Sequence, residues 1–309
     1  MTAYVARRLG ATIPVLLGVS VLVFAMLHAV PGDLVSLLAV RSSAGLTPAQ
    51  ESRIRHELGL DRPLVVQYGE FLANALRGDL GRSYYTNQRV TNAVLQQLPA
   101  TLQLAGAAML FAVVVGGGLG LVAALRQNSW ADNLAMVFSL GGLSIPMFWS
   151  GLILIYLFAV ELRWVPIVGG RGWAALVLPA VALGYDAAAF VARMVRSSVL
   201  EVLRQDYVRI ARAKGLSERR VTLRHVLKAA MIPIVTLVGL NAGRLLSGAV
   251  VVETVFARQG IGSLAVDAIL YKDYFLVQGI VLLAASIYVL LNLTVDVSYA
   301  WLDPRIHYQ

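Results

Sequence analysis

The residue types that suggest chemistry gather in one long basic segment, residues 206–233, which reads DYVRIARAKGLSERRVTLRHVLKAAMIP. A short helix is predicted after Gly215, because glycine ends helices and Ser217 is a residue type that caps the next one. Residues four apart share a helix face, so a basic stripe is predicted at Arg220, Arg224 and Lys228. An apolar stripe is predicted beside it at Leu223, Val226, Leu227 and Ala230. This pattern favours a helix that presses against an anionic membrane surface or a partner protein.

Patterns for catalysis and metal binding are missing from the sequence. It has no G-x-x-x-x-G-K-[ST] phosphate loop, so the chain is not expected to bind ATP by that route. The glycine run at 116–120 lies in an apolar stretch, where close helix packing is the preferred interpretation. The serines in or near apolar runs have no histidine and acid placed to form a triad. There is no cysteine and the four histidines lack ligand spacing, so no metal site made by this chain alone is predicted.

The composition indicates a membrane protein. The chain of 309 residues is 58% hydrophobic and 14% charged, with a mean hydropathy of +0.72. Soluble domains are about 45–50% apolar and about 25% charged. The net charge of +9 could suggest nucleic acid, but the charges are concentrated in a few loops and no surface of interleaved basic and aromatic residues is evident. Nucleic acid is therefore excluded as a partner.

Six apolar runs are long enough to cross a bilayer, given about 20 residues per span. They are residues 9–30, 101–125, 134–160, 176–195, 232–252 and 276–302. The first is too long for a signal peptide and is followed by no cleavage site. Residues 31–99 have turn signals, charges of both signs and two helical stretches, near 48–58 and 63–76, which is typical of a folded extracytoplasmic segment. The sequence predicts an all-α, polytopic membrane protein with about six transmembrane helices, the third kinked at Pro146.

The basic residues set the orientation of these spans. From residue 193 to residue 228 there are ten lysines and arginines against three acidic residues. Short loops rich in basic residues stay in the cytoplasm, so residues 196–231 are predicted to form a cytoplasmic loop. The N-terminus and the C-terminus are then also cytoplasmic.

Three polar residues lie inside the apolar runs: Asp186 in the fourth span, and Asn241 and Arg244 in the fifth. A charge at the bilayer centre costs about 2.5–3.5 kcal/mol, so each charged residue must face the bundle, water or an opposite charge. One interpretation is a substrate pathway in which Arg244 meets a carboxylate and Asp186 meets an ammonium group. The other is a structural Asp186–Arg244 pair that closes on itself.

The motifs together resemble one family along nearly the whole chain. The run ARAKGL, then SERRV, then the segment ending at Pro233 resembles the cytoplasmic loop of ABC importer permeases, in the branch that serves dipeptides, oligopeptides, nickel and glutathione. Further matches are Pro31-Gly32-Asp33, the stretch 78–84 (GDLGRSY), the stretch 248–256 (GAVVVETVF), and residues 292–296 and 302–305. Two residues depart from the general pattern, since Arg209 occupies a glutamate position and Gln259 a proline position.

This resemblance implies a type I ABC importer permease fold with residues 1–309 as a single permease domain. It implies a multi-pass protein of the bacterial cytoplasmic (inner) membrane that forms half of a pore. The implied partners are a homologous second permease, two ABC ATPase subunits, an extracytoplasmic substrate-binding protein, and a peptide or similar small solute. No cofactor is expected in this chain, since ATP and Mg would be bound by the ATPase subunits.

The family's loop docks into a cleft on the ATPase, and the resemblance assigns this coupling role to a set of residues here. They are Arg209, Ala211, Lys214, Gly215, Leu216, Ser217, Glu218, Arg219, Arg220, Val221, Leu223 and Arg224. Arg219, Arg220 and Arg224 would orient the docking. Leu216, Val221 and Leu223 would supply buried contact with the ATPase.

Two alternatives to a peptide importer stay open at the level of sequence. One keeps the architecture and changes the cargo to nickel, glutathione or another small solute. The other is an ATP-independent channel or secondary transporter, in which the basic loop binds only anionic membrane lipid. The sequence shows no clear inverted repeat in support of this second alternative.

Overall fold

The computed structural model describes residues 2–29, 47–57, 59–84, 86–165 and 172–302. In these ranges the regular structure is helical, apart from an isolated bridge between Arg82 and Arg89. The chain divides into two compact units. Unit 1 contains residues 1–5, 97–263 and 288–309, and unit 2 contains residues 6–96 and 264–287. The all-α prediction is confirmed.

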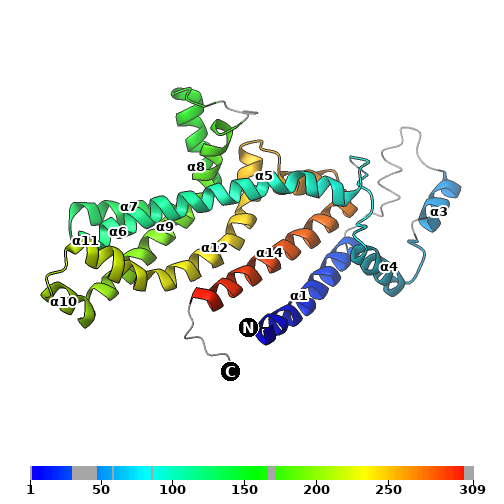
Figure 1. The fold of residues 1–309 in the computed structure, drawn as a ribbon. Helices are drawn as coiled ribbons and strands as arrows, with labels where there is room; N and C mark the ends of the chain where they lie inside the picture. The colour runs from blue at the N-terminus through cyan, green and yellow to red at the C-terminus, as the bar shows by residue number, and fades with distance from the viewer. Residues whose placement is uncertain (1, 30–46, 58, 85, 166–171, 303–309) are drawn as a thin grey trace. The chain divides into compact units, whose positions relative to one another are not determined.

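Unit 1 is built around α9 (Ala174–Leu203), against which most of its other helices pack. Its first helices in chain order are the main part of α5 (Val90–Phe111), the π-helical turn η1 (Ala112–Gly116), α6 (Gly117–Leu125), α7 (Trp130–Ser144), α8 (Met147–Leu154) and the π-helical stretch η2 (Ile155–Glu161). After α9 come α10 (Asp206–Ala213), α11 (Glu218–Arg220), the π-helical stretch η3 (Val221–Val226), α12 (Leu227–Val255) and the second half of α14 (Tyr274–Leu302). The helices α6, α7, α8 and α12 all contact α9, which Figure 1 shows in green beside them.

Glycines permit the closest of these helix contacts. A Cβ on Gly116 would lie 2.3 Å from the carbonyl oxygen of Ala188, and a Cβ on Gly120 would lie 2.3 Å from that of Ala192. Any side chain at these two positions would therefore push α6 and η1 away from α9. The prediction that the glycine run serves helix packing is confirmed.

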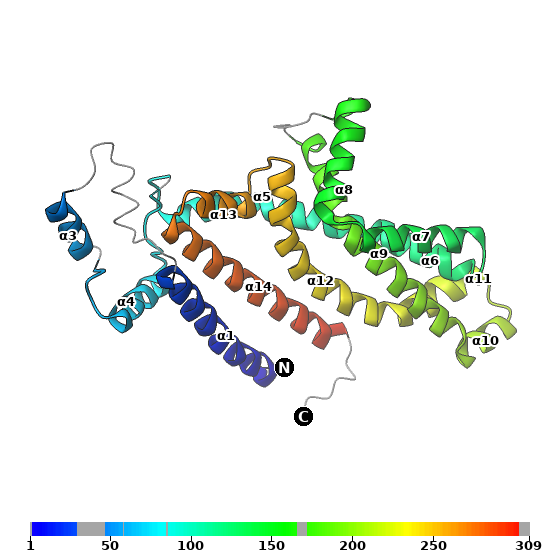
Figure 2. The same ribbon diagram turned by 180° about the vertical axis from the view of Figure 1, so that it is seen from behind.

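Pro146 marks a complete break, which is a larger change than the predicted kink. The axes of α7 and the α8–η2 stretch (Met147–Glu161) are bent by 111°, so α8 leaves the line of α7 (Figure 2). Ile145 has extended backbone angles, φ −87° and ψ 123°, as a residue before proline prefers. The predicted third span is thus either one broken span made of two helices or a re-entrant membrane loop.

Length and composition identify three helices in the described residues that could cross a membrane, and a fourth if the bent pair counts as one span. The three are Val90–Leu125, Ala175–Leu203 and Tyr274–Leu291. They overlap the predicted second, fourth and sixth spans. Within the predicted first span, Gly10–Met26 is a shorter apolar helix. The count of six spans stays a prediction.

Unit 2 contains most of α1 (Thr2–Ala29), α3 (Pro48–Glu57), α4 (Leu64–Leu76), and parts of α13 (Ile261–Leu270) and α14 (Tyr274–Leu302). The predicted helical stretches near 48–58 and 63–76 correspond to α3 and α4. The helix α4 packs against α1, because the Ser20 hydroxyl lies 2.8 Å from the Tyr68 hydroxyl and the Phe24 ring lies 5.4 Å from the Tyr68 ring. The extracytoplasmic placement of residues 31–99 stays a prediction.

The stretch 78–84 packs against the start of α14, also in unit 2. The Ser83 hydroxyl donates a 2.6 Å hydrogen bond to the Asp273 carboxylate, which also accepts the Leu276 N–H at the first turn of α14. A Cβ on Gly81 would lie 2.9 Å from the Phe275 ring. This packing explains the glycine at position 81 and the serine at position 83 of the motif. The motif residues 31–33 and 303–305 lie outside the described residues.

A second buried carboxylate, Glu253, organises the end of α12 in unit 1. It is fully buried and accepts hydrogen bonds from the Thr101 hydroxyl at 2.6 Å and the Gly262 N–H at 2.8 Å. A Cβ on Gly260 would lie 2.2 Å from this carboxyl group. The glycines that follow the V-V-E-T-V-F motif are therefore needed to make room for its glutamate. The N–H groups at the start of a helix favour a negative charge in this position.

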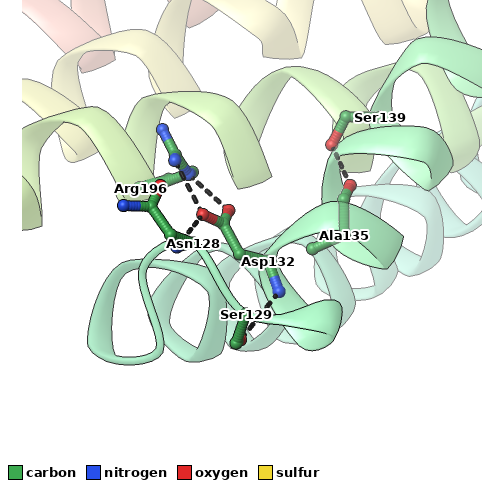
Figure 3. A network of polar contacts seen from close by, with 6 residues as sticks. All are labelled: Asn128, Ser129, Asp132, Ala135, Ser139 and Arg196. Carbon is green, nitrogen blue, oxygen red and sulfur yellow. Dashed lines mark hydrogen bonds and ion pairs between the residues drawn. The ribbon is translucent and has the colours of Figure 1, made fainter.

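An ion pair between α7 and α9 fixes the start of α7 (Figure 3). Arg196 donates from Nε and Nη2 to the two carboxylate oxygens of Asp132, at 2.7 and 2.8 Å. Asp132 is 3% exposed, and its carboxylate also accepts the Asn128 N–H at 3.0 Å. Ser129 caps α7 by accepting the Asp132 N–H at 3.4 Å. The paired geometry compensates for removing these charges from water.

We predict that Asp132→Ala destabilises the chain by about 3 kcal/mol, because it leaves the guanidinium of Arg196 largely buried and unpaired. The double variant Asp132→Leu with Arg196→Leu should lose less stability than the sum of the losses in the single variants Asp132→Leu and Arg196→Leu. Thermal melting of the detergent-solubilised full-length chain measures both. Additive losses in the double variant would contradict a coupled pair.

Candidate coupling surface and polar site

The first predicted site begins with α10, a short amphipathic helix. Val208 is fully buried and Ala211 is 8% exposed, and both pack in an apolar cluster with residues of α9. Arg209 and Ile210, on the opposite side, are exposed. Ala211 therefore anchors α10 to the rest of unit 1, and Arg209 belongs to the surface.

Gly215 ends α10 in a Schellman motif. Its φ is +77°, in the left-handed region, where a side chain costs conformational energy. The Gly215 N–H donates to the Arg212 carbonyl at 2.9 Å, and the Leu216 N–H donates to the Ala211 carbonyl at 3.3 Å. These two bonds and the apolar residue after the glycine define the motif. Nothing lies within 4 Å of the position that a Cβ would take, so the glycine is required by backbone conformation and not by space.

The helix after Gly215 differs from the short, separate helix predicted. Beyond the first turn α11, the chain continues through η3 into α12 with helical backbone angles at both junctions. Residues 218–255 thus form one continuous helix, called here the 218–255 helix (yellow in Figure 1). Ser217 occupies the predicted capping position but makes no side-chain capping bond. The predicted coupling helix and the predicted fifth span are consecutive parts of the same helix.

The exposed side of this region is basic. Its exposed basic residues are Arg209, Arg212, Lys214, Arg219, Arg220, Arg224 and Lys228, and the exposed acidic residues beside them are Asp206 and Glu218. Leu223 is 54% exposed among them, so an apolar side chain is available to a partner. The prediction that Val221 supplies contact with a partner is wrong, because Val221 is fully buried against the apolar cluster that includes Val208. Leu216 is half-buried against the same cluster.

One contact at this turn was missed from the sequence. Arg212 of α10 donates from Nε and Nη2 to the two carboxylate oxygens of Glu218, at 2.8 and 3.1 Å. Glu218 is the first residue of α11, where the helix dipole favours a negative charge. The available signal was an arginine three residues before Gly215 and a glutamate three residues after it.

The second predicted site brings together all three residues named for it. The Arg244 Nη2 donates to the Asp186 carboxylate at 3.0 Å, across α9 and α12, and its Nη1 donates to the Asn241 side-chain oxygen at 3.4 Å. The Asn241 residue is 4% exposed, whereas the Arg244 side chain is 62% exposed. The structural pair that the sequence suggested is therefore formed. It leaves much of the Arg244 side chain exposed, so contact with a cargo stays a proposal.

Comparison with known proteins identifies the family. Residues 116–308 match the model of the binding-protein-dependent transport system inner membrane component, and residues 1–105 match the model of the N-terminal part of a binding-protein-dependent transport system membrane component. The chain belongs to this family. It is an ABC importer permease with an all-α fold, as predicted.

Two relatives match this permease along their whole length. The di/tripeptide transport system permease protein DppB of Pseudomonas aeruginosa (strain UCBPP-PA14) is 43% identical, with 100% of both chains covered. The glutathione transport system permease protein GsiC of Escherichia coli (strain K12) is 42% identical, also with 100% of both chains covered. The alternative of an ATP-independent channel or secondary transporter is set aside by this family membership.

Solved structures show the same fold at low sequence identity. An inward-facing structure of the MetNI methionine ABC transporter matches with a TM-score of 0.55 and 19% identity, covering 68% of this permease and 95% of that chain. An amino acid ABC transporter in complex with histidines matches with a TM-score of 0.53 and 18% identity, covering 70% and 95%. The fold is therefore that of ABC importer permeases.

Proposed function

We propose that this permease forms half of the translocation pathway of an importer for di- or oligopeptides, and that the turn around Gly215 couples the pathway to ATPase subunits. The single observation that carries the proposal is the 218–255 helix, because it joins both candidate sites. Arg219, Arg220 and Arg224 lie at its cytoplasmic start in the predicted orientation, and Arg244 lies 20 residues beyond Arg224. The predicted fifth span begins at Ile232, so Arg244 lies 12 residues into it, about 18 Å at 1.5 Å per residue and near the middle of a hydrocarbon core about 30 Å thick.

This helix gives the coupling a physical route. Two ATPase subunits that close on ATP would move the surface formed by α10, the Gly215 turn and α11. Since η3 and α12 continue the same helix, the movement reaches Arg244 and its Asp186 partner on α9 without an intervening loop. A small rotation of the helix at its coupling end would make or break the contact between Arg244 and Asp186. Alternating access requires such a change between two states of the pathway.

Docking on the ATPase would use both charged and apolar contacts. The exposed arginines orient the permease on an acidic cleft of the ATPase. Leu223 supplies apolar contact with the ATPase. Val221 and Ala211 are buried in the apolar cluster with residues of α9, and they fix the docking surface to the rest of unit 1. The remaining subunits proposed are a homologous second permease and an extracytoplasmic substrate-binding protein. Both termini are proposed to lie in the cytoplasm, with the complex in the inner membrane.

Short peptides are the preferred cargo because of the polar pair and the two relatives. A peptide with free ends carries a carboxylate and an ammonium group, which match Arg244 and Asp186 in charge. Glutathione, the cargo named for one relative, carries the same two groups and remains an alternative. Nickel also remains an alternative cargo of the same architecture.

We predict that Gly215→Pro and Leu216→Asp uncouple ATP hydrolysis from uptake. Proline fixes φ near −65° and has no N–H for the Arg212 carbonyl, so the Schellman motif is lost. Aspartate places a charge in the apolar cluster beneath the turn. The assay is dialanine uptake together with ATP hydrolysis in proteoliposomes that contain the assembled importer. Gly215→Asn is the matched control, because asparagine tolerates the left-handed region. Normal, substrate-stimulated hydrolysis and uptake in the first two variants would overturn the coupling role.

A further prediction concerns Arg244. Arg244→Ala should lower dialanine uptake about tenfold, the effect of losing about 1.4 kcal/mol of binding, and Arg244→Ala with Asp186→Ala should not restore it. The wild-type importer should also take up dialanine better than its C-terminal amide, and the Arg244 variant should lose this preference because the guanidinium no longer meets the carboxylate. Co-purification of the other subunits serves as the control for assembly. If the double variant regains both assembly and full uptake, the pair is only structural.

A further inference from the structure

We infer that Arg212 and Glu218 act as positioning residues, which hold α10 and the 218–255 helix at a fixed angle across the Gly215 turn. This inference rests on the coupling role proposed above. Nε and Nη2 of Arg212 donate to both oxygens of Glu218, at 2.8 and 3.1 Å, so the contact is bidentate. A bidentate arginine–carboxylate contact restricts orientation as well as distance, because both groups are planar.

The backbone alone fixes only one side of this turn. The two Schellman bonds join Gly215 and Leu216 to carbonyl groups of α10, and neither bond reaches α11. On the other side, Ser217 makes no side-chain capping bond, and the Val221 N–H to Ser217 carbonyl bond belongs to the new helix itself. Among the described residues, Arg212–Glu218 is the ion pair that joins α10 to α11.

Buried contacts complete the arrangement from beneath. Val208 and Ala211 of α10 pack in one cluster with Val221 of η3, with Leu216 against its edge. Aliphatic contacts hold the two helices together but allow one to rotate on the other, since they are not directional. The ion pair supplies the directional contact. The docking surface therefore keeps one shape when the ATPase moves it.

The pair is open to solvent, which makes its role measurable. The Arg212 side chain is 41% exposed and that of Glu218 is 68% exposed. Salt screens exposed charges, so the contact weakens as ionic strength rises. Direct contact of either residue with the ATPase is the alternative explanation for any effect of mutation. The two explanations differ when the charges are exchanged, because exchange preserves the pair but reverses each charge toward a partner.

The experiment compares Arg212→Glu, Glu218→Arg and the exchanged double variant in proteoliposomes that contain the assembled importer. Dialanine taken up per ATP hydrolysed should fall about two- to fivefold in each single variant, the range of a good exposed ion pair, and should return close to the wild-type value in the exchanged variant. Arg204→Glu is the matched control, an exposed arginine at the end of α9 with no ion-pair partner among the described residues. It should leave the ratio unchanged. In the wild type, raising the salt concentration should lower the ratio toward that of the single variants.

Each other outcome decides between named explanations. An exchanged variant as poor as the single variants would overturn the inference in favour of direct contact with the ATPase, and unchanged ratios in the single variants would overturn it outright. If these variants are normal while Leu216→Asp uncouples, the coupling role stands and only the ion pair fails. If the wild type hydrolyses ATP but takes up no dialanine, the peptide cargo fails, and the same ratio is measured with glutathione.

Discussion

The close approach of α9 to its neighbours is the constraint on which unit 1 depends. The carbonyl oxygens of Ala188 and Ala192 lie 2.3 Å from the positions that a Cβ on Gly116 or Gly120 would take, which is closer than any Cβ could approach. In a bilayer there is no hydrophobic force to bring helices together, so such backbone contacts and polar bonds between helices do more of the work. The helix α9 held in this way carries Asp186 near its middle and Arg196 further along, and it leads directly into α10. The polar site at Asp186 and the coupling surface that begins with α10 therefore both depend on the close packing of α9 against η1 and α6.

The two candidate sites are also joined through the 218–255 helix. A π-helical stretch, Val221–Val226, lies between its first turn and α12. Such stretches are uncommon and frequently accompany function. Here the stretch buries Val221, Thr222 and Val226 while Leu223 and Arg224 stay exposed. One short segment is thus anchored to unit 1 and presents a surface at the same time, which a coupling element needs.

The sequence predicted features that depend on local chemistry and on charge in an apolar setting. Glycine and proline geometry predicted the turn at Gly215, a kink at Pro146 and the packing role of the glycine run, and helix and turn signals predicted α3 and α4. The cost of a lone charge in lipid predicted the Asp186–Arg244 pair as one of two interpretations. Features that depend on which helix face is covered were missed. The family resemblance grouped Val221 with Leu223 as contacts for the ATPase, but only the position of α10 shows which of the two is buried. Arg196 and Asp132 are 64 residues apart, and no local pattern joins them.

The exposure of Arg244 supports the proposal that this permease works in an assembly. Its side chain, in the middle of an apolar helix, is 62% exposed even when paired with Asp186. A charge facing hydrocarbon at that depth costs about 2.5–3.5 kcal/mol, so this side of α9 and α12 must face water or protein. By contrast, the exposed side chains of α7 include Leu134, Val137 and Leu140, which lipid covers at no such cost. In the proposed importer this polar side would line the pathway, whose opposite wall would come from another subunit. The homologous second permease proposed above would provide that wall.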